Sequence, residues 1–381
     1  MKRILALVLA LTMTLACATA FAQASGDPIK IGLTTVLTGD RSLEGEYATN
    51  VVEIVTEEIN SAGGVLGRPI EIVIEDAQGT DVGAVTAWKK LAADDDIVAI
   101  ISSDSSNDNL AVADLAKEAQ ILTTGQGSSP TLRDTCNENP WMFQLRACDV
   151  TLCEALIAYA VEELGYQTFA IIHETESSSV DQAGLFTSAL AKYGIEPELT
   201  LGFATGTKDL TAQLVQIQAA NVDAVIGAAF SDQAALLLQQ MRMIGMEDMP
   251  VLGSNGFTDV VTIRLAGDAC EGVMAATHWA PSTTNPKGAA LQAKYKELFG
   301  EDCGKSAAQV YDHILVICEA IERAGTTDRA AVRDAMNTID SFEGAMTTYD
   351  CTTNGDCGRG GLLVVVQNGE AVVLDEIISE K

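Results

Sequence analysis

The sequence predicts an α/β fold with two lobes, each built on a doubly wound parallel sheet, and three observations support this prediction. From residue 29 onward, short apolar runs alternate with amphipathic helical segments, a pattern that builds a parallel sheet with helices on both faces. The same alternation restarts after Cys148, so the chain supplies strands for a second sheet. Too few strands follow the last helices to build a third domain. These helices are therefore expected to return to the first lobe, so that several crossover strands join the lobes.

The first lobe begins with the clearest alternation of strands and helices. The helix predicted at 45–61 ends at Gly63 and Gly64, and residues 97–101 form a continuous apolar run of the kind that is buried on both faces of a parallel sheet. Strands are expected at 29–36, 70–75, 97–101 and 121–124, and helices at 45–61, 81–93 and 107–119.

The second lobe repeats the pattern. Strands are expected at 168–172, 224–229 and 251–253, and helices at 151–164, 181–193, 213–220 and 233–244. Further helices at 285–299, 306–324 and 329–339 precede late strands at 362–366 and 371–374. We therefore expect residues 27–147 and 279–345 to form lobe one, and residues 148–278 and 346–381 to form lobe two.

The first 22 residues have the pattern of a cleaved secretory signal peptide. Lys2 and Arg3 precede an apolar run over 4–15, and Ala-Phe-Ala at 20–22 precedes the expected cleavage site. Lipidation at Cys17 is the alternative to soluble export. Both outcomes place the mature chain in the periplasm or another extracytoplasmic space, and no later apolar run reaches the roughly 18 residues that span a bilayer.

The charge of the chain argues against polyanionic partners. Lys and Arg total 23 against 53 Asp and Glu, a formal net charge of -30, and aromatic residues make up only 5% of the sequence. Such a surface repels phosphate backbones and offers few platforms for base stacking. We therefore expect no nucleic-acid partner, and we expect a monomer.

Eight cysteines follow Cys17, and an even number in an exported chain favours disulfides over a metal site. Cys351 and Cys357 are the pair most expected to bond, because the turn-forming residues 352–356 can bring their sulfurs together. Cys318 lies in an apolar helical run and is interpreted as a buried thiol. The remaining connectivity stays open, and neither a metal nor a cofactor is expected.

Three polar loops follow predicted strands of the first lobe, where doubly wound sheets bind their ligands. These loops cover residues 38–45, 102–106 and 124–130 and are rich in Ser, Thr and Gly. Hydroxyl groups and N–H groups at helix starts suit a carboxylate or another small anion. The alternative is that these residues only form caps and turns. Because several loops converge on one sheet edge, we favour a ligand cleft between the lobes.

The sequence does not carry the motifs of an enzyme. Its histidines are His173, His278 and His313, and a structural, hydrogen-bonded role is favoured even for His173, which follows a strand. No serine nucleophile elbow, phosphate-binding loop or His-Glu-x-x-His motif occurs. We therefore expect no catalytic activity.

Several motifs together indicate a family. The most specific are Glu-Ile-Asn-Ser-Ala-Gly-Gly-Val-Leu-Gly-Arg-Pro-Ile at 58–70 and Leu-Ala-Gly-Asp-Ala-Cys-Glu-Gly-Val at 265–273. Supporting segments lie at 29–32, 37–39, 75–76, 111–119, 128–130 and 307–312. Over nearly the whole mature chain, the sequence resembles the periplasmic substrate-binding proteins of branched-chain amino acid ABC transporters. The resemblance implies the type I periplasmic binding fold, a small-molecule ligand and an ABC permease as partner.

The resemblance also implies a ligand site. By matching position, Ser105, Ser128 and the backbone of Gln126 would hold the ligand's α-carboxylate, and the aromatic residue of lobe two is retained as Phe230.

Three positions depart from the family pattern. Asn255 replaces the acid that usually takes the ligand's ammonium group, Ser178 replaces a tyrosine, and Glu44 replaces an aromatic residue. An amide loses the charge-assisted bond to an ammonium, which is worth about 1.5 to 3 kcal/mol. Either Glu44 supplies the missing charge from the opposite lobe, or the ligand has no ammonium; a Glu44 that merely faces solvent is the third interpretation. Amino acids, urea, short amides and aromatic carboxylates all remain candidates.

Two functions are compatible with this pattern. The first is a transport receptor that closes its lobes on a ligand and presents the closed form to a permease. The second is a sensor or co-receptor of the same fold that feeds a signalling protein.

Overall fold

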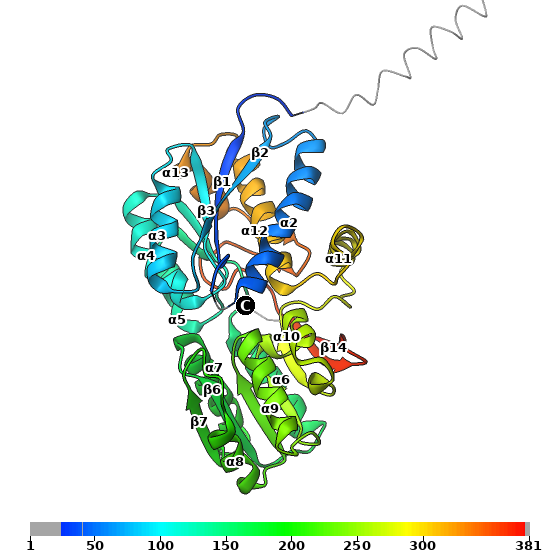
Figure 1. The fold of residues 1–381 in the computed structure, drawn as a ribbon. Helices are drawn as coiled ribbons and strands as arrows, with labels where there is room; N and C mark the ends of the chain where they lie inside the picture. Colours follow the sequence, from blue (N-terminus) through cyan, green and yellow to red (C-terminus); the bar gives the residue numbers. More distant parts are fainter. Residues whose placement is uncertain (1–23, 40, 378–381) are drawn as a thin grey trace, which may run out of the picture.

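The computed structural model describes residues 24–39 and 41–377. The expected signal peptide at 1–22, with Cys17, lies outside the described residues. The described chain forms two lobes, one above the other in Figure 1, and each lobe is an α/β layer structure built on its own sheet. The predicted fold class is therefore confirmed.

The first sheet has its 5 strands in the order β2-β1-β3-β4-β5, and all its pairs are parallel. Because β1 lies between β2 and β3, the connections after β1 and β3 leave on opposite faces and open a crevice at their carboxyl ends. The strands are β1 (Ile29–Thr35), β2 (Ile70–Asp76), β3 (Ile97–Ile101), β4 (Leu122–Gly125) and β5 (Met142–Gln144).

Helices cover both faces of the first sheet. On one face, α2 (Ser42–Ser61) packs against α12 (Lys305–Ala324), and on the other, α3 (Asp81–Ala92) packs against α4 (Ser106–Ala119). The late helices α11 (Pro286–Phe299) and α13 (Arg329–Met336) bury apolar side chains in the same core as α2 and α12. Residues far apart in the sequence thus complete the first lobe.

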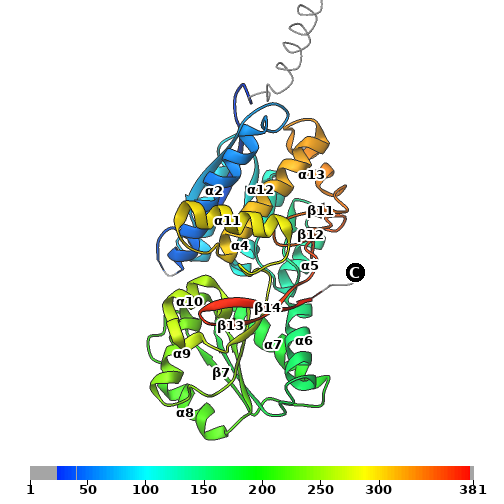
Figure 2. The ribbon, with the colours of Figure 1, turned by 90° about the vertical axis from the view of Figure 1, so that its right-hand side faces the viewer.

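The second sheet has 7 strands in the order β14-β13-β10-β9-β8-β6-β7. Five of these strands are parallel: β6 (Phe169–Glu174), β7 (Leu199–Phe203), β8 (Ala224–Ala228), β9 (Val251–Gly253) and β10 (Met274–Thr277). The hairpin of β13 (Gly361–Gln367) and β14 (Glu370–Ile377) joins β10 in antiparallel orientation, so this sheet is mixed rather than purely parallel. Figure 2 shows the hairpin across the top of the lower lobe, below α11.

Helices also cover both faces of the second sheet. Helices α6 and α7 pack in one hydrophobic cluster on one face of the sheet, and α8, α9 and α10 pack in a second cluster on the other face. Their bounds are α6 (Asp149–Glu162), α7 (Ser177–Ala191), α8 (Thr211–Ala220), α9 (Ser231–Met243) and α10 (Val260–Ala266). None of the described helices has the length and apolar character needed to cross a bilayer.

Residues 346–360, which the expected division assigns to lobe two, contact lobe one instead. Here β11 (Phe342–Glu343) pairs with β12 (Thr348–Tyr349), and Tyr349 and Cys351 are buried in the first core. Burial of these apolar side chains keeps the chain in lobe one until it crosses to β13. The rest of the division remains our proposal.

The expected disulfide lies in this same segment. Cys351 and Cys357 are both buried, and the sulfur of Cys357 lies 3.3 Å from the carbonyl oxygen of Thr353. The structure does not show a bond between the two sulfurs, so the disulfide stays a prediction.

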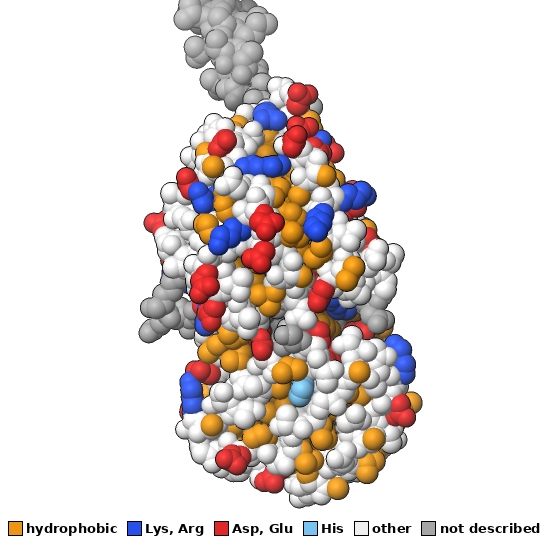
Figure 3. Space-filling view, turned by 90° about the vertical axis from the view of Figure 1, so that its left-hand side faces the viewer, with side chains coloured by type: hydrophobic (Ala, Val, Ile, Leu, Met, Phe, Trp, Pro, Cys, Tyr) orange, Lys and Arg blue, Asp and Glu red, His pale blue; other side chains and the backbone are white. Residues whose placement is uncertain are grey.

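The lobes meet at a waist. Figure 3 shows them as two rounded bodies, with acidic and basic side chains interspersed over the upper one. The carboxyl ends of the parallel strands in both sheets point toward this waist, which makes it the place to look for a site.

Candidate functional site

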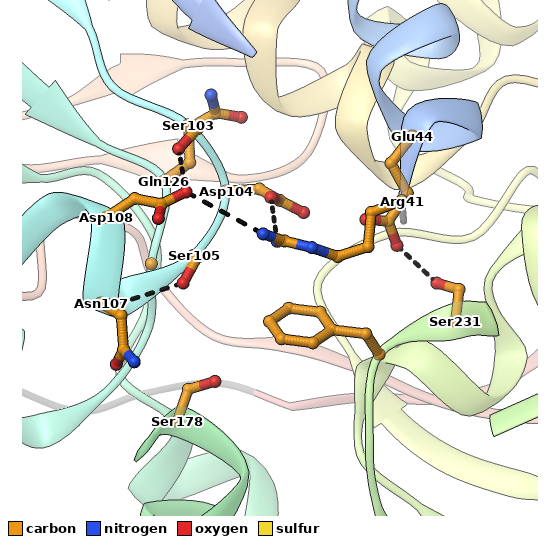
Figure 4. A network of polar contacts seen from close by, with 12 residues as sticks. Arg41, Glu44, Ser103, Asp104, Ser105, Asn107, Asp108, Gln126, Ser178 and Ser231 are labelled. Carbon is orange, nitrogen blue, oxygen red and sulfur yellow. Dashed lines mark hydrogen bonds and ion pairs between the residues drawn. The ribbon is translucent and has the colours of Figure 1, made fainter. Parts of the chain in front are cut away.

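Loops from both sheets converge between the lobes. From lobe one, residues 41–44 follow β1, residues 102–105 follow β3, and residues 126–129 follow β4. From lobe two, residues 229–231 follow β8 and residues 254–255 follow β9. Figure 4 shows side chains of both lobes directed toward one another across this space. The cleft expected from the sequence is therefore present as a meeting of polar loops.

Arg41 reaches across the cleft from lobe one to lobe two. It has a left-handed backbone, with φ of 67°, at the start of α2. Its guanidinium donates to Asp104 Oδ1 at 3.0 Å, and its Cζ lies 4.4 Å from the centre of the Phe230 ring of lobe two. Figure 4 shows the guanidinium directed toward Asp104. A cation over an aromatic ring in a buried site stabilises contact between the lobes.

Asp104 is ionised by this arrangement. Burial is the largest influence and opposes its ionisation, but the charges of Arg41, Lys305 and Arg146 together outweigh burial and hold the pKa of Asp104 below its ordinary value. The Arg41–Asp104 ion pair is therefore complete within the protein.

Glu44 lies in the first turn of α2 and is 4% exposed. Its Oε1 accepts a hydrogen bond of 2.7 Å from the hydroxyl of Ser231 in lobe two, a contact drawn in Figure 4. Burial, with the nearby charge of Asp104, raises the pKa of Glu44 from 4.5 to about 8. Glu44 is thus protonated at neutral pH and does not face solvent, so the third interpretation of this residue is wrong.

Two further cations line the cleft. Arg146 follows β5 and donates to the carbonyl oxygen of Gln126 at 3.0 Å and to Nδ1 of His278 at 2.9 Å. Lys305 opens α12, and its Nζ donates to Oδ1 of Asn255 at 3.3 Å. Arg146 and Lys305 are 6% and 3% exposed. Neither forms an ion pair with a carboxylate among the described residues.

The residues expected from the sequence lie around this cleft. Ser128, Ser178, Phe230 and Asn255 line a cavity of about 30 Å³, together with Asp104, Ser106, Arg146, Ser179, Gln182, Ala229, Ser254 and Lys305. Glu44 and Gln126 line a neighbouring cavity of about 10 Å³. The first cavity has room for only a few water molecules, so the lobes are closed on each other.

The hydroxyl groups of Ser105 and Ser128, which are expected to hold a carboxylate, differ in how easily they can turn toward a ligand. Ser105 caps α4 by accepting from the backbone N–H of Asn107, and its hydroxyl donates weakly to Glu176 of lobe two at 3.5 Å. Ser128 donates to Asp149 Oδ2 at 2.9 Å. The Ser105 hydroxyl can turn to a ligand at little cost, whereas Ser128 must give up a buried charge-assisted bond.

Larger cavities lie outside the cleft. One of about 400 Å³ is bordered by Tyr47, Arg264 and Glu301, and one of about 440 Å³ is bordered by Met241, Met246 and Pro250 at the far end of lobe two. Neither collects buried charges from both sheets, so the narrow cleft is the better candidate site.

Sequence reasoning gave no role to three charged residues of the cleft, Arg41, Arg146 and Lys305, and considered Asp104 only as an alternative acid for a ligand ammonium. Arg41 and Asp104 stand in the polar loops that follow β1 and β3, and a charge in such a loop was the available signal. Arg146 and Lys305 carry no local signal, because each reaches the cleft only through the crossing of the chain between lobes.

Comparisons with known proteins agree with this geometry. A family model described as periplasmic binding protein matches residues 28–370. A leucine-, isoleucine-, valine-, threonine- and alanine-binding protein of Pseudomonas aeruginosa is 25% identical over 320 residues, covering 84% of this chain and 84% of that protein.

Solved structures give the same result. The leucine-binding protein of Thermotoga maritima matches with a TM-score of 0.84 and 25% identity, covering 92% of this chain and 99% of that chain. A solute-binding protein of an ABC transporter from R. palustris, in complex with benzoate, matches with a TM-score of 0.83 and 18% identity, covering 92% and 97% of the two chains.

Proposed function

The chain belongs to the periplasmic binding protein family, as the sequence motifs predicted, and from this premise we propose that it captures a small polar ligand by closing its two lobes and delivers it to an ABC permease. Substrate-binding proteins of this type work outside the cytoplasm, and the Pseudomonas aeruginosa relative is named for the amino acids that it binds. The ligand of this chain is a small polar molecule, such as an amino acid, an amide or a small carboxylate.

One observation supports the proposal above all others: polar side chains of the two lobes contact each other across the cleft. Arg41 stacks on Phe230, Glu44 accepts from Ser231, and Lys305 donates to Asn255. Five of these residues lie in loops or helix starts at the carboxyl ends of strands, and Lys305 opens α12, which follows α11. A ligand in this space contacts both lobes only when they are closed, so its binding energy favours the closed state.

The chemistry of the cleft favours binding over catalysis. His278 is hydrogen-bonded to Arg146 and to the carbonyl oxygen of Ala147, and burial holds its pKa far below the ordinary value. His313 is likewise neutral, because burial lowers its pKa to about 3. These histidines serve as fixed hydrogen-bonding groups, and the described cleft offers no serine or cysteine paired with a free base.

A scattering experiment tests the proposal. A thermal-shift screen of amino acids, amides and small carboxylates first identifies a ligand of the mature protein. Small-angle X-ray scattering is then measured with and without that ligand at saturation. The expected result is a smaller radius of gyration in the ligand-bound sample, whereas an unchanged radius with proven binding contradicts lobe closure.

A further inference from the structure

Lys305 is a buried cation whose ammonium group has a neutral hydrogen-bond partner. It is 3% exposed, and its Nζ donates to the amide oxygen of Asn255 at 3.3 Å. No described carboxylate forms an ion pair with it. A buried ammonium normally has a carboxylate partner, because an unpaired charge loses its hydration without compensation.

Arg146 is a second buried cation that forms no ion pair with a described carboxylate. It is 6% exposed, its two terminal nitrogens donate to a carbonyl oxygen and to a neutral histidine, and its Nε has no hydrogen-bond partner in the described structure. Burial lowers the pKa of Arg146, although the nearby charges of Asp149 and Asp104 act in the opposite direction. Arg146 and Lys305 line the same cavity.

The acids around this cavity are already engaged. Asp104 pairs with Arg41, and Glu44 carries a proton at neutral pH. Asp149 accepts hydrogen bonds from Ser128 and Gln182.

The remaining nearby acids serve the backbone. Glu176 caps α7 and accepts from Ser178, and Asp259 caps α10 and accepts from the backbone N–H of Lys305. A ligand ammonium would therefore meet two cations, and the oxygen of Asn255 is already used by Lys305. The carboxylate oxygen without a hydrogen-bond partner among the described residues lining the cavity, Oδ2 of Asp104, belongs to a group that is already paired with Arg41.

We propose that the cleft selects an anionic ligand without an ammonium group, and that Lys305 and Arg146 together bind its carboxylate. The inference rests on the proposed receptor function and names the ligand class of that site. It assigns to Lys305 the role of specificity determinant: the lysine pairs with the ligand anion and repels the ammonium of an amino acid. Phe230, the one aromatic side chain among the described residues lining the cavity, offers its ring to the apolar part of the ligand.

Matched pairs of small molecules test the inference. Leucine is compared with 4-methyl-2-oxopentanoate, and phenylalanine with phenylpyruvate, so that each pair differs in whether the α-carbon carries an ammonium or a ketone. Benzoate and leucinamide complete the set, the first with only a carboxylate as its charged group and the second with only an ammonium. Affinities are measured by calorimetry on the mature wild-type protein and on Lys305→Met. Lys192→Met, which removes an exposed lysine paired with Glu154, is the control.

The expected result is that at least one ammonium-free carboxylate binds, and binds at least about tenfold tighter than its amino acid counterpart. Lys305→Met weakens this binding by about tenfold to a hundredfold, and Lys192→Met leaves it unchanged. Without ligand, Lys305→Met melts at the same or a higher temperature, because it removes an unpaired buried charge.

Three results would overturn the inference. These are tighter binding of the amino acid in both pairs, wild-type affinity for carboxylates in Lys305→Met, and no binding of any carboxylate in the set. If an amino acid or a neutral solute still compacts the wild-type protein, the receptor function stands and only the ligand class is wrong. If no small molecule of the wider screen binds or compacts it, the receptor function itself fails.

Discussion

Glu44 makes the free energy of unfolding depend on pH, and a single substitution at this residue can separate its contribution from those of other groups. Its pKa is 4.5 in the unfolded chain and about 8 in the folded protein, chiefly because its carboxyl is buried. Between these two pH values the folded state holds a proton that the unfolded state has lost. The free energy of unfolding therefore falls as pH rises through this window, and Glu44→Gln removes the effect.

The size of the effect follows from one proton. Each pH unit inside the window costs about 1.4 kcal/mol, so raising the pH from 5.5 to 7.5 lowers the contribution of Glu44 by about 2 to 3 kcal/mol. The amide introduced by Glu44→Gln keeps an oxygen that accepts from Ser231, so the fold is expected to persist. Asp108 and Glu174 also have raised pKa values, of about 6 and about 7, but they contribute equally in both proteins and cancel in the comparison.

Urea unfolding at the two pH values measures this difference directly. When the pH rises from 5.5 to 7.5, the free energy of unfolding of Glu44→Gln should increase by about 2 to 3 kcal/mol relative to that of the wild type. Glu162→Gln, which alters an exposed glutamate that also accepts from a hydroxyl, is the matched control and should follow the wild type. Parallel pH dependence of Glu44→Gln and wild type would refute the reasoning and mean that Glu44 is ionised in the fold.

Three other substitutions probe the cleft. Ser105→Ala should weaken carboxylate binding by about 1 to 3 kcal/mol in calorimetry and lower stability by about 1 kcal/mol through loss of the α4 cap, and wild-type affinity would remove Ser105 from the site. Asn255→Asp should pair with Lys305, raise the melting temperature and weaken carboxylate binding, whereas tighter leucine binding would contradict the ammonium-free ligand. Phe230→Ala should weaken lobe closure by about 1 to 2 kcal/mol because it removes the ring under Arg41, and unchanged ligand affinity and compaction would show that this contact does not stabilise the closed state.

Much of the fold was predictable because its signals are local. The longer strands of lobe one and the main helices carry continuous apolar runs or clear helical periodicity, and the structure confirms them. Strands β5, β7 and β10 of the two large sheets were missed, as were the two-residue strands β11 and β12. β5 and β10 are short, at 3 and 4 residues, and β7 alternates half-buried and exposed positions at a sheet edge, so none has a distinctive pattern.

The antiparallel hairpin of β13 and β14 shows a different limit. Both strands were expected, but their direction relative to β10 depends on how the chain returns from lobe one, which local patterns do not record.

The candidate site was predictable only in its loops. Ser128, Ser178, Phe230 and Asn255 do line one cavity, because each follows a strand or opens a helix at one of the two sheet edges that face each other. The charges that decide its chemistry were not predictable. Lys305 reads as an ordinary first-turn residue of α12, and its burial against Asn255 arises only because α12 belongs to lobe one while Asn255 belongs to lobe two.

The most direct test of the account is to identify the small molecule that the protein retains when it is purified without dialysis. Native mass spectrometry of the folded protein gives the mass of the bound molecule, and denaturation releases it for chemical identification. The account predicts one bound molecule per chain that carries a carboxylate and does not react with amine-directed reagents. Release of leucine or another α-amino acid would contradict the role assigned to Lys305 and Arg146.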